Sequence, residues 1–172
     1  MECKWLPELI YYNDFDSCEE YKAALYKIFC DDLKNSTLTL DGLKIQIRYH
    51  PKENNMEEAF YHVTCQDYNK DKDRAPDFRR CERIKWIRKF IENINCNEPD
   101  CEDCEGIKVW EEKYKSNKRI HILLEEERYI VVLEKRPKYI LLITAFYIEH
   151  DHFLDKKIKQ YNRYKAKNAS QR

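Results

Sequence analysis

The sequence predicts an α+β domain with a mostly antiparallel sheet of about four strands and flanking helices. Three runs rich in β-branched and aromatic residues follow one another at hairpin spacing, at Arg119–Leu124, Tyr129–Leu133 and Tyr139–Tyr147, which is typical of strands. A basic amphipathic segment, Phe153–Tyr164, comes after them and indicates a closing helix. A run of strands bracketed by helices favours the α+β class with a mostly antiparallel sheet.

The first third of the chain predicts a helix followed by a hairpin. Ser17 and Glu20 form a capping box, and the apolar residues after them recur at helical spacing, so a helix begins here and lies on the core. Two short apolar runs flank Asp41-Gly42, a pair that supplies the positive φ of a type I′ turn. We interpret Phe60–Cys65 as a further short strand.

The clearest helix in the sequence spans Asp77–Ile94. Isoleucines at spacings of three and four form its apolar stripe: Ile84, Ile87, Ile91 and Ile94. The acidic segment Asn95–Gly106 contains three cysteines and is expected to be a loop. Ile107–Trp110 then begins the run of strands.

The length of 172 residues corresponds to one domain. We expect a single domain over residues 1–166, with a helical N-terminal part at 1–36 and a core at 37–165. Residues 167–172 are expected to be a disordered tail. Low glycine and proline content argues against flexible linkers and low-complexity repeats.

Net charge indicates no class of partner, because Lys+Arg and Asp+Glu both number 32. The N-terminus lacks a signal-peptide pattern, and no apolar run approaches the roughly 18 residues that span a bilayer. We therefore expect a cytoplasmic protein with no membrane partner. In a reducing compartment, the eight cysteines are interpreted as buried thiols, metal ligands or both, and not as a disulfide framework.

His62 is the first residue that is suited to catalysis. It lies in the run Phe60-Tyr61-His62-Val63-Thr64, with aromatic residues before it and a small polar residue after it. A lone histidine in such a run is more often an ordinary core or edge residue. The alternative is a general acid or base, because the unperturbed pKa of imidazole lies near neutrality.

Several polar residues interrupt the apolar strands. Thr144 and Tyr147 fall on opposite faces of their strand unless a bulge intervenes, and each is most simply a hydrogen-bonded sheet residue. The other such residues are His121, Glu134, Lys135 and Arg136. Cations and hydroxyls embedded in a sheet are suited to binding phosphate, but polar sheet edges have the same composition.

The predicted helix after Asp77 is strongly basic. Six cations lie between Arg79 and Lys89, and Trp86 lies among them. The simplest interpretation is a solvated helix face. The alternative is contact with a nucleic-acid backbone, in which Arg79 and Arg83 bind phosphate, because they share a helix face with Trp86.

The cysteines of the acidic loop have the spacing Cys96-x4-Cys101-x2-Cys104. A Cys-x2-Cys pair can chelate zinc, and a third cysteine nearby adds to this interpretation. Cys65 and Cys81 are candidates for a fourth ligand. Free thiols in a polar loop are the simpler alternative; zinc, if bound, would be structural, because the loop offers no acid/base group for a catalytic site.

No glycine-rich phosphate loop, serine nucleophile elbow or His-Glu-x-x-His motif is present, so nucleotide hydrolysis and the common protease classes receive no support. The chain instead resembles a phage-associated group within the barnase–EndoU–colicin–RelE superfamily of small ribonucleases. The matching words occur in the order of that family over roughly residues 40 to 165. They are Ala59–Thr64, Asp77–Arg88, Lys108–Trp110, Arg119–Leu124, Tyr129–Lys135 and Tyr139–Tyr147.

The resemblance implies a compact sheet of about four antiparallel strands and metal-independent RNA cleavage of the toxin or phage-effector type. The RNA 2′-hydroxyl would attack the adjacent phosphate, with one group accepting its proton and another protonating the leaving oxygen. By position, His62 would be the acid/base, Thr144 and Tyr147 would position or protonate, and Lys135 would stabilise the phosphate charge. The implied substrate-binding residues are Arg79, Arg83 and Arg136.

No cofactor is expected for this chemistry, although a structural zinc at the cysteine loop is compatible with it. The expected partners are RNA and an antitoxin or immunity protein. Two rival functions remain open: a non-catalytic phage or prophage module that binds nucleic acid or protein through the same sheet, and a zinc-stabilised interaction module built around Cys96–Cys104.

Overall fold

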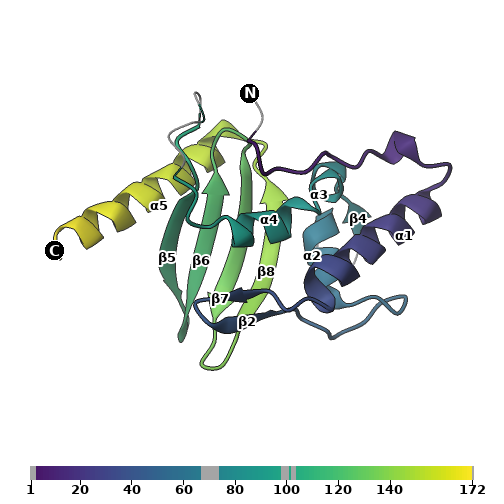
Figure 1. Ribbon diagram of the computed structural model, residues 1–172, viewed down its shortest axis with the longest axis horizontal. Coiled ribbons are helices and arrows are strands. Elements are labelled where there is room, and N and C mark those ends of the chain that lie inside the picture. Colours follow the sequence, from purple (N-terminus) through teal and green to yellow (C-terminus); the bar gives the residue numbers. More distant parts are fainter. Residues whose placement is uncertain (1–2, 67–73, 98–100, 102–103, 172) are drawn as a thin grey trace.

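The computed structural model describes residues 3–66, 74–97, 101 and 104–171, and within these residues it has a six-stranded sheet with helices on both faces (Figure 1). The helices and strands are η1 (Tyr12–Asp14), α1 (Cys18–Phe29), η2 (Cys30–Lys34), β1 (Thr39–Leu40), β2 (Leu43–Gln46), α2 (Glu58–Thr64), β3 (Cys65–Gln66), β4 (Ala75–Pro76), α3 (Phe78–Glu82), α4 (Trp86–Glu92), β5 (Lys108–Tyr114), β6 (Asn117–Leu124), β7 (Tyr129–Lys135), β8 (Ile140–Tyr147) and α5 (Asp151–Ala169).

The α+β class is confirmed, but the sheet differs in detail from the expected one. Its strand order is β1-β2-β8-β7-β6-β5, and the four long strands β5 to β8 are antiparallel neighbours. The hairpin β1–β2 adds two more strands, because Ile45 and Gln46 pair in parallel with Ile140 and Leu141. The sheet of the described residues is therefore mixed and has six strands, not four antiparallel ones.

The sheet has a separate core on each face. Helix α4 and the N-terminal segments cover one face, where Phe90, Trp86 and Tyr129 pack edge to face or stacked. Helix α5 covers part of the other face, where its half-buried aromatic and aliphatic residues meet Trp110 and Ile130 (Figure 1). Because both faces are covered, the central strands are apolar on both sides.

The first helix and hairpin form as predicted. Ser17 Oγ accepts the backbone N–H of Glu20 at 3.1 Å and begins α1. Asp41 and Gly42 both have positive φ, 52° and 77°, as a type I′ turn requires, and they join β1 to β2. Helix α5 also confirms the predicted closing helix, and it continues to Ala169, so residues 167–169 of the expected tail are helical; Arg172 lies outside the described residues.

The prediction of a strand at Phe60–Cys65 is wrong. Residues Glu58–Thr64 form helix α2, and only Cys65–Gln66 is extended. Nearly every residue of α2 is buried, so its short apolar run has no polar face from which a period of 3.6 or 2 could be recognised. The single helix expected at Asp77–Ile94 is likewise two helices, α3 and α4, separated by residues 83–85.

None of the helices described is both long enough and apolar enough to cross a membrane.

Candidate functional site

Within the part of the chain that the structure describes, one edge of strand β8 has no neighbouring strand along most of its length. Strand β2 pairs only with Ile140 and Leu141 at the start of β8. Helices α2 and α3 pack beside the rest of the strand. Side chains of these two helices therefore meet the polar residues of β8, and this junction is the candidate site.

A threonine, an arginine and a histidine backbone group meet at the junction. Thr144 Oγ1 donates a hydrogen bond to the carbonyl oxygen of His62 at 3.0 Å. Arg80 Nη1 donates to the same carbonyl at 2.8 Å and to Thr144 Oγ1 at 3.4 Å. The guanidinium of Arg80 also lies 5.4 Å from the centroid of the Phe146 ring. These contacts hold α2, α3 and β8 in one arrangement and place a cation beside a hydroxyl.

The imidazole of His62 is oriented by a carboxylate of its own helix. His62 Nε2 lies 3.1 Å from Glu58 Oε1, one helical turn earlier, and Arg74 pairs with the same oxygen. Burial raises the pKa of Glu58, but Arg74, with His62 and Arg48, outweighs burial and leaves that pKa below its ordinary value. Glu58 therefore stays ionised and can accept an imidazole N–H.

A second group of residues lies on the other face of β8. The guanidinium groups of Arg79 and Arg83 lie 4.6 and 4.8 Å from the centroid of the Tyr147 ring. Arg83 also lies 5.2 Å from the Trp86 ring. Tyr147 pairs with Tyr129 whereas Thr144 pairs with Val132, and these two partners belong to different cores, so Thr144 and Tyr147 face opposite sides of the sheet as strand alternation predicts.

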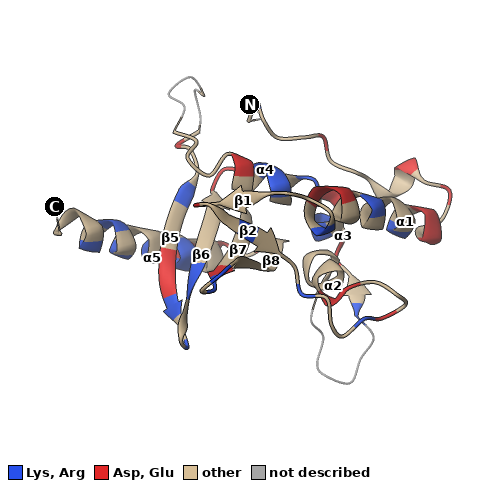
Figure 2. Cartoon of the chain, turned by 60° about the horizontal axis from the view of Figure 1, so that its bottom comes forward, with Lys and Arg blue, Asp and Glu red and all other residues tan. Residues whose placement is uncertain are grey.

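The junction is basic, although carboxylates neutralise part of its charge. Positions of Lys and Arg, coloured blue on the ribbon, lie along α3 and α4 (Figure 2). Asp77 caps α3 by accepting the backbone N–H groups of Arg79 and Arg80, and its other oxygen lies 3.4 Å from Arg80 Nε. Glu82 lies 3.3 Å from Arg83 Nη1. Arg79, by contrast, is exposed and turns its guanidinium to an aromatic ring.

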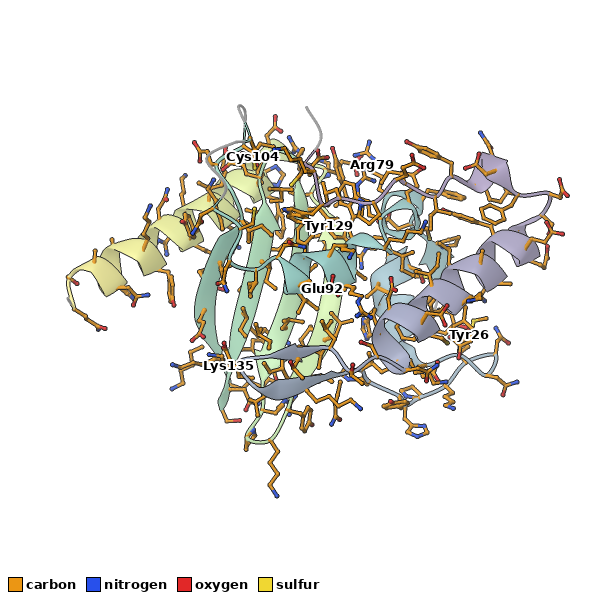
Figure 3. All side chains as sticks on the ribbon, in the orientation of Figure 1. Tyr26, Arg79, Glu92, Cys104, Tyr129 and Lys135 are labelled. Atoms are coloured by element: carbon orange, nitrogen blue, oxygen red, sulfur yellow. The ribbon has the colours of Figure 1, made fainter. Side chains whose placement is uncertain are left out.

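Lys135 and Arg136 do not belong to this junction. Lys135, at the far end of β7, forms an ion pair with Glu111, and Arg136 lies 2.6 Å from Glu134. Tyr129 pairs with Tyr147 and lies six residues from Lys135, a strand length of about 20 Å. Figure 3 likewise places Arg79 and Lys135 toward opposite ends of the sheet.

His121 and Glu134 have structural contacts on the α5 face. The His121 ring stacks on Trp110 at a centroid distance of 4.9 Å, and its Nε2 lies 3.4 Å from Glu112. Burial, with Lys157 and Arg119 nearby, lowers the pKa of His121 to about 3; Glu112 is more than one-third exposed and does not offset burial. Glu134 is buried between Arg119 and Arg136.

Sequence reasoning missed Glu58, Arg74 and Arg80. The pairing of Glu58 with His62 has a helical spacing of four, so it was concealed by the wrong prediction of a strand. Arg80 was seen only as one of several cations on a helix. The signal that was available is Asp77 at the N-cap, which fixes the first turn of α3 and hence the direction of the arginines that follow.

The loop cysteines are separate from Cys65 and Cys81. Those two line an apolar pocket with Tyr21 and Leu25, and the Cys81 thiol donates to the Thr64 carbonyl at 3.3 Å. They are therefore poorly placed to complete a site with Cys96–Cys104. Among the described residues, no group of three or more His, Cys, Asp and Glu side chains is already arranged to hold a metal ion.

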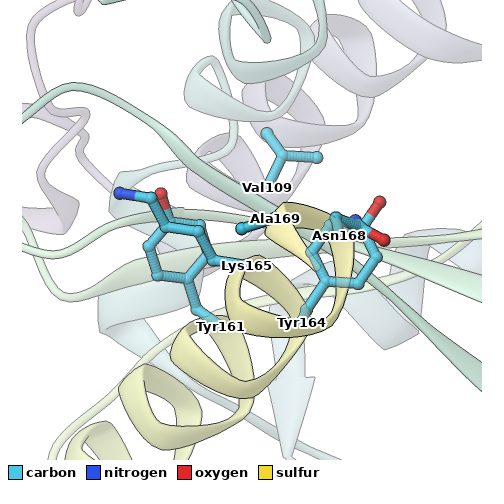
Figure 4. Close-up of a pocket in the computed structure, with 6 residues that line it drawn as sticks. All are labelled: Val109, Tyr161, Tyr164, Lys165, Asn168 and Ala169. Atoms are coloured by element: carbon cyan, nitrogen blue, oxygen red, sulfur yellow. The ribbon is translucent and has the colours of Figure 1, made fainter. Parts of the chain in front are cut away.

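A further hollow, of about 420 Å³, lies between β5 and α5 (Figure 4). Tyr161, Tyr164, Lys165 and Asn168 of α5 line it together with Val109 of β5. It contains no histidine or carboxylate and is distant in the fold from the β8 junction, so it offers no acid/base chemistry.

No protein-family model, curated protein or solved structure matches the chain. Its function must therefore be inferred from the arrangement of its own side chains.

Proposed function

We propose that this protein is a metal-independent endoribonuclease of the toxin or phage-effector type, which cleaves RNA by attack of a 2′-hydroxyl on the adjacent phosphate. The observation that carries the proposal is the hydrogen-bonding of Arg80 to both the His62 carbonyl and Thr144. These contacts bring the backbone of His62, the Arg80 guanidinium and the Thr144 hydroxyl together beside β8, which supports a shared role for the three residues.

In this proposal His62 transfers the proton. Its imidazole is suited to both accepting and donating a proton near neutral pH, and Glu58 holds the ring in one orientation. Arg80 stabilises the negative charge that develops on the phosphate. Thr144 acts as a positioning residue, because its hydroxyl proton is already donated to the His62 carbonyl.

Arg79, Arg83 and Tyr147 bind the RNA strand in the same proposal. Arg79 is exposed and therefore accessible to a phosphate, and Tyr147 offers a half-buried ring beside it. Lys135 and Arg136 have no part in the chemistry, because they lie at the other end of the sheet in ion pairs with Glu111 and Glu134. The cognate partner would be an antitoxin or immunity protein that covers this basic junction.

We also propose that the fold is an elaborated barnase/RelE-like sheet. Its four long antiparallel strands, β5 to β8, would be the common part, and the β1–β2 hairpin would be an addition at one edge. The cytoplasm is the proposed compartment, where RNA is available and thiols remain reduced.

The test is RNA cleavage with and without EDTA, comparing the wild type with His62→Ala. We expect EDTA-resistant cleavage and a loss of about 10²–10⁴ in rate for the variant. His152→Ala is the matched control, because His152 is an exposed histidine at the start of α5. A folded His62→Ala protein that cleaves RNA at the wild-type rate would rule out the assigned role.

The rival function is a module that binds nucleic acid without cleaving it. It is favoured by the packing of Arg79 and Arg83 on Tyr147, because a cation–aromatic surface binds a nucleic-acid strand without any acid/base group. RNA binding that is lost in Arg83→Gln, together with no cleavage by the wild type, would establish this alternative.

A further inference from the structure

An apolar pocket of about 200 Å³ lies between α1, α2 and α3. These three helices gather on one side of the sheet, away from the C-terminal end of α5 (Figure 1). Every residue that lines the pocket is among those that the structure describes. Helix α1 contributes one of its faces, because its lining residues recur at helical spacing: Cys18, Tyr21, Lys22 and Leu25. Helices α2 and α3 add further aromatic rings: Phe60, Tyr61 and Phe78.

The hydroxyl protons in the pocket walls are already donated elsewhere. The hydroxyls of Tyr21 and Tyr61 donate to main-chain carbonyl oxygens at 2.9 and 2.8 Å. Thr64 Oγ1 donates to the Phe60 carbonyl oxygen at 2.7 Å, one helical turn earlier. A bound water molecule needs about two to four polar partners, so these walls are better suited to an apolar ligand than to water.

The volume and the rings indicate the size and kind of ligand. An apolar cavity of about 150 Å³ is large enough to bind benzene, so this pocket can accommodate one aromatic ring with a short substituent. Phe78 is exposed and stacks on Tyr21 at a centroid distance of 6.4 Å, so one aromatic wall of the pocket reaches solvent. A ligand ring that covers this wall would gain both apolar burial and ring–ring contacts.

Two cations give the pocket a positive side. The Lys22 ammonium lies 5.4 Å from the centroid of the Tyr61 ring, and the Arg74 guanidinium lies 5.2 Å from the same centroid. Arg74 pairs with Glu58, whereas Lys22 forms no ion pair with any of the described residues. Lys22 is also half-buried, and a partly desolvated ammonium is stabilised by an anion beside it.

We propose that this pocket binds a small aromatic carboxylate, whose ring lies among Tyr21, Leu25 and Phe60 and whose carboxylate pairs with Lys22. Apolar walls with a few polar groups that fix orientation are the usual form of a small-molecule site. Arg74 adds a second positive charge on the same side. A neutral ring would lack the ion pair, and an aromatic amine would be repelled by both cations, so the pocket selects an anion.

The pocket adjoins the candidate site without sharing its assigned residues. Arg74 pairs with the same Glu58 oxygen that lies 3.1 Å from His62 Nε2. None of the described residues that line the pocket has a role in the proposed RNA cleavage. Carboxylate binding and RNA cleavage can therefore each fail without the other.

The experiment is a fluorine NMR titration of the full-length protein with para-fluorobenzoate and with para-fluorotoluene, a neutral ring of similar size. We expect saturable binding of para-fluorobenzoate with a dissociation constant on the order of 0.1–1 mM, and weaker binding of para-fluorotoluene. Lys22→Met should weaken para-fluorobenzoate binding by about three- to tenfold and leave para-fluorotoluene binding unchanged. Lys27→Met is the matched control, because Lys27 is exposed on the same helix and pairs with Asp31.

Three results of this titration would overturn the proposal: no saturable binding, equal affinity of the wild type for the two probes, or an equal loss in Lys22→Met and Lys27→Met. A second measurement on the wild type keeps the test decisive if Lys22→Met does not fold. Fluorine–proton Overhauser contacts should join bound para-fluorobenzoate to the methyl groups of Leu25, which is buried in the pocket wall. Contacts to other methyl groups and none to Leu25 would place the ligand elsewhere and overturn the assignment.

Discussion

Arg80 and Arg79 are adjacent arginines, of which the first is expected to stabilise the fold and the second is not. Replacing each in turn by methionine distinguishes the two contributions. Arg80 is half-buried and makes a 2.8 Å hydrogen bond to the His62 carbonyl, whereas Arg79 is exposed and, among the described residues, its guanidinium contacts the Tyr147 ring. Methionine preserves most of the apolar stem, so the comparison reports on the guanidinium group.

The expected magnitudes follow from these contacts. A hydrogen bond from a charged donor contributes about 1.5–3 kcal/mol, and the contact with Phe146 adds about 0.5–1 kcal/mol. Thr144 still donates to the His62 carbonyl in the variant, so that oxygen is not left unpaired. We therefore expect Arg80→Met to lower the free energy of unfolding by about 2–3 kcal/mol, and Arg79→Met by less than about 1 kcal/mol.

Urea denaturation followed by tryptophan fluorescence measures both values. For a domain of this size, the Arg80 effect corresponds to a melting temperature lower by roughly 4–12 °C. For RNA affinity we expect the opposite order, with a larger loss in Arg79→Met than in Arg80→Met, because Arg79 is the residue accessible to phosphate. Equal destabilisation by the two substitutions would refute the inference that the Arg80 contacts hold α2 and α3 against β8.

Three further predictions concern other parts of the molecule. Arg83→Gln should reduce the salt dependence of RNA binding by about one charge, whereas Lys85→Gln should do much less, and equal slopes in a salt titration would show a diffuse basic surface. Burial, with Lys157 and Arg119 nearby, lowers the pKa of His121 from 6.5 in the unfolded chain to about 3 in the folded one, so the stability linked to its neutral form is fully present above pH 6.5 and is lost as pH falls toward 3, by up to about 1.4 kcal/mol per pH unit. His121→Phe should therefore make the free energy of unfolding depend less on pH between 7 and 4. Parallel curves for the wild type and the variant would argue against a neutral buried imidazole. Thr144→Val should cost about 0.5–1.5 kcal/mol of stability by removing the bond to the His62 carbonyl, and an unchanged urea midpoint would show that Arg80 alone satisfies that oxygen.

The local elements of the fold were predictable because their signals are local. The alternation and β-branching of Arg119–Leu124 and Tyr129–Leu133 identify β6 and β7, and the Asp41-Gly42 turn identifies the first hairpin. The parallel pairing of Ile45 with Ile140 was not predictable, because no local pattern links two segments so distant in the sequence. This pairing accounts for the additional strands of the sheet.

Helix α2 shows why a completely buried segment is difficult to predict. Phe60, Tyr61, Val63 and Thr64 are all buried, and aromatic and β-branched residues favour a strand by propensity. A helix forms because tertiary contacts outweigh that propensity: Phe60 meets Phe29 and Tyr26 of α1 edge to face, and the Tyr61 hydroxyl donates to the Glu53 carbonyl at 2.8 Å.

The residue types of the candidate site could be predicted from the sequence, but their positions in the fold could not. His62, Arg79, Arg83, Thr144 and Tyr147 were selected by residue type, and the structure places all of them along β8 and its flanking helices. Lys135 and Arg136 were selected in the same way, but they lie at the other end of the sheet, because residue type carries no information on position along a strand.

Glu58 is a partner of His62 only because α2 is a helix. In a strand, Glu58 and His62 would be separated by about 13 Å, whereas in a helix a spacing of four places them in contact. The carboxylate that orients the imidazole is thus a consequence of the tertiary burial that makes α2 helical. Weakening the contact of Phe60 with α1 should therefore separate Glu58 from His62 before the sheet itself unfolds.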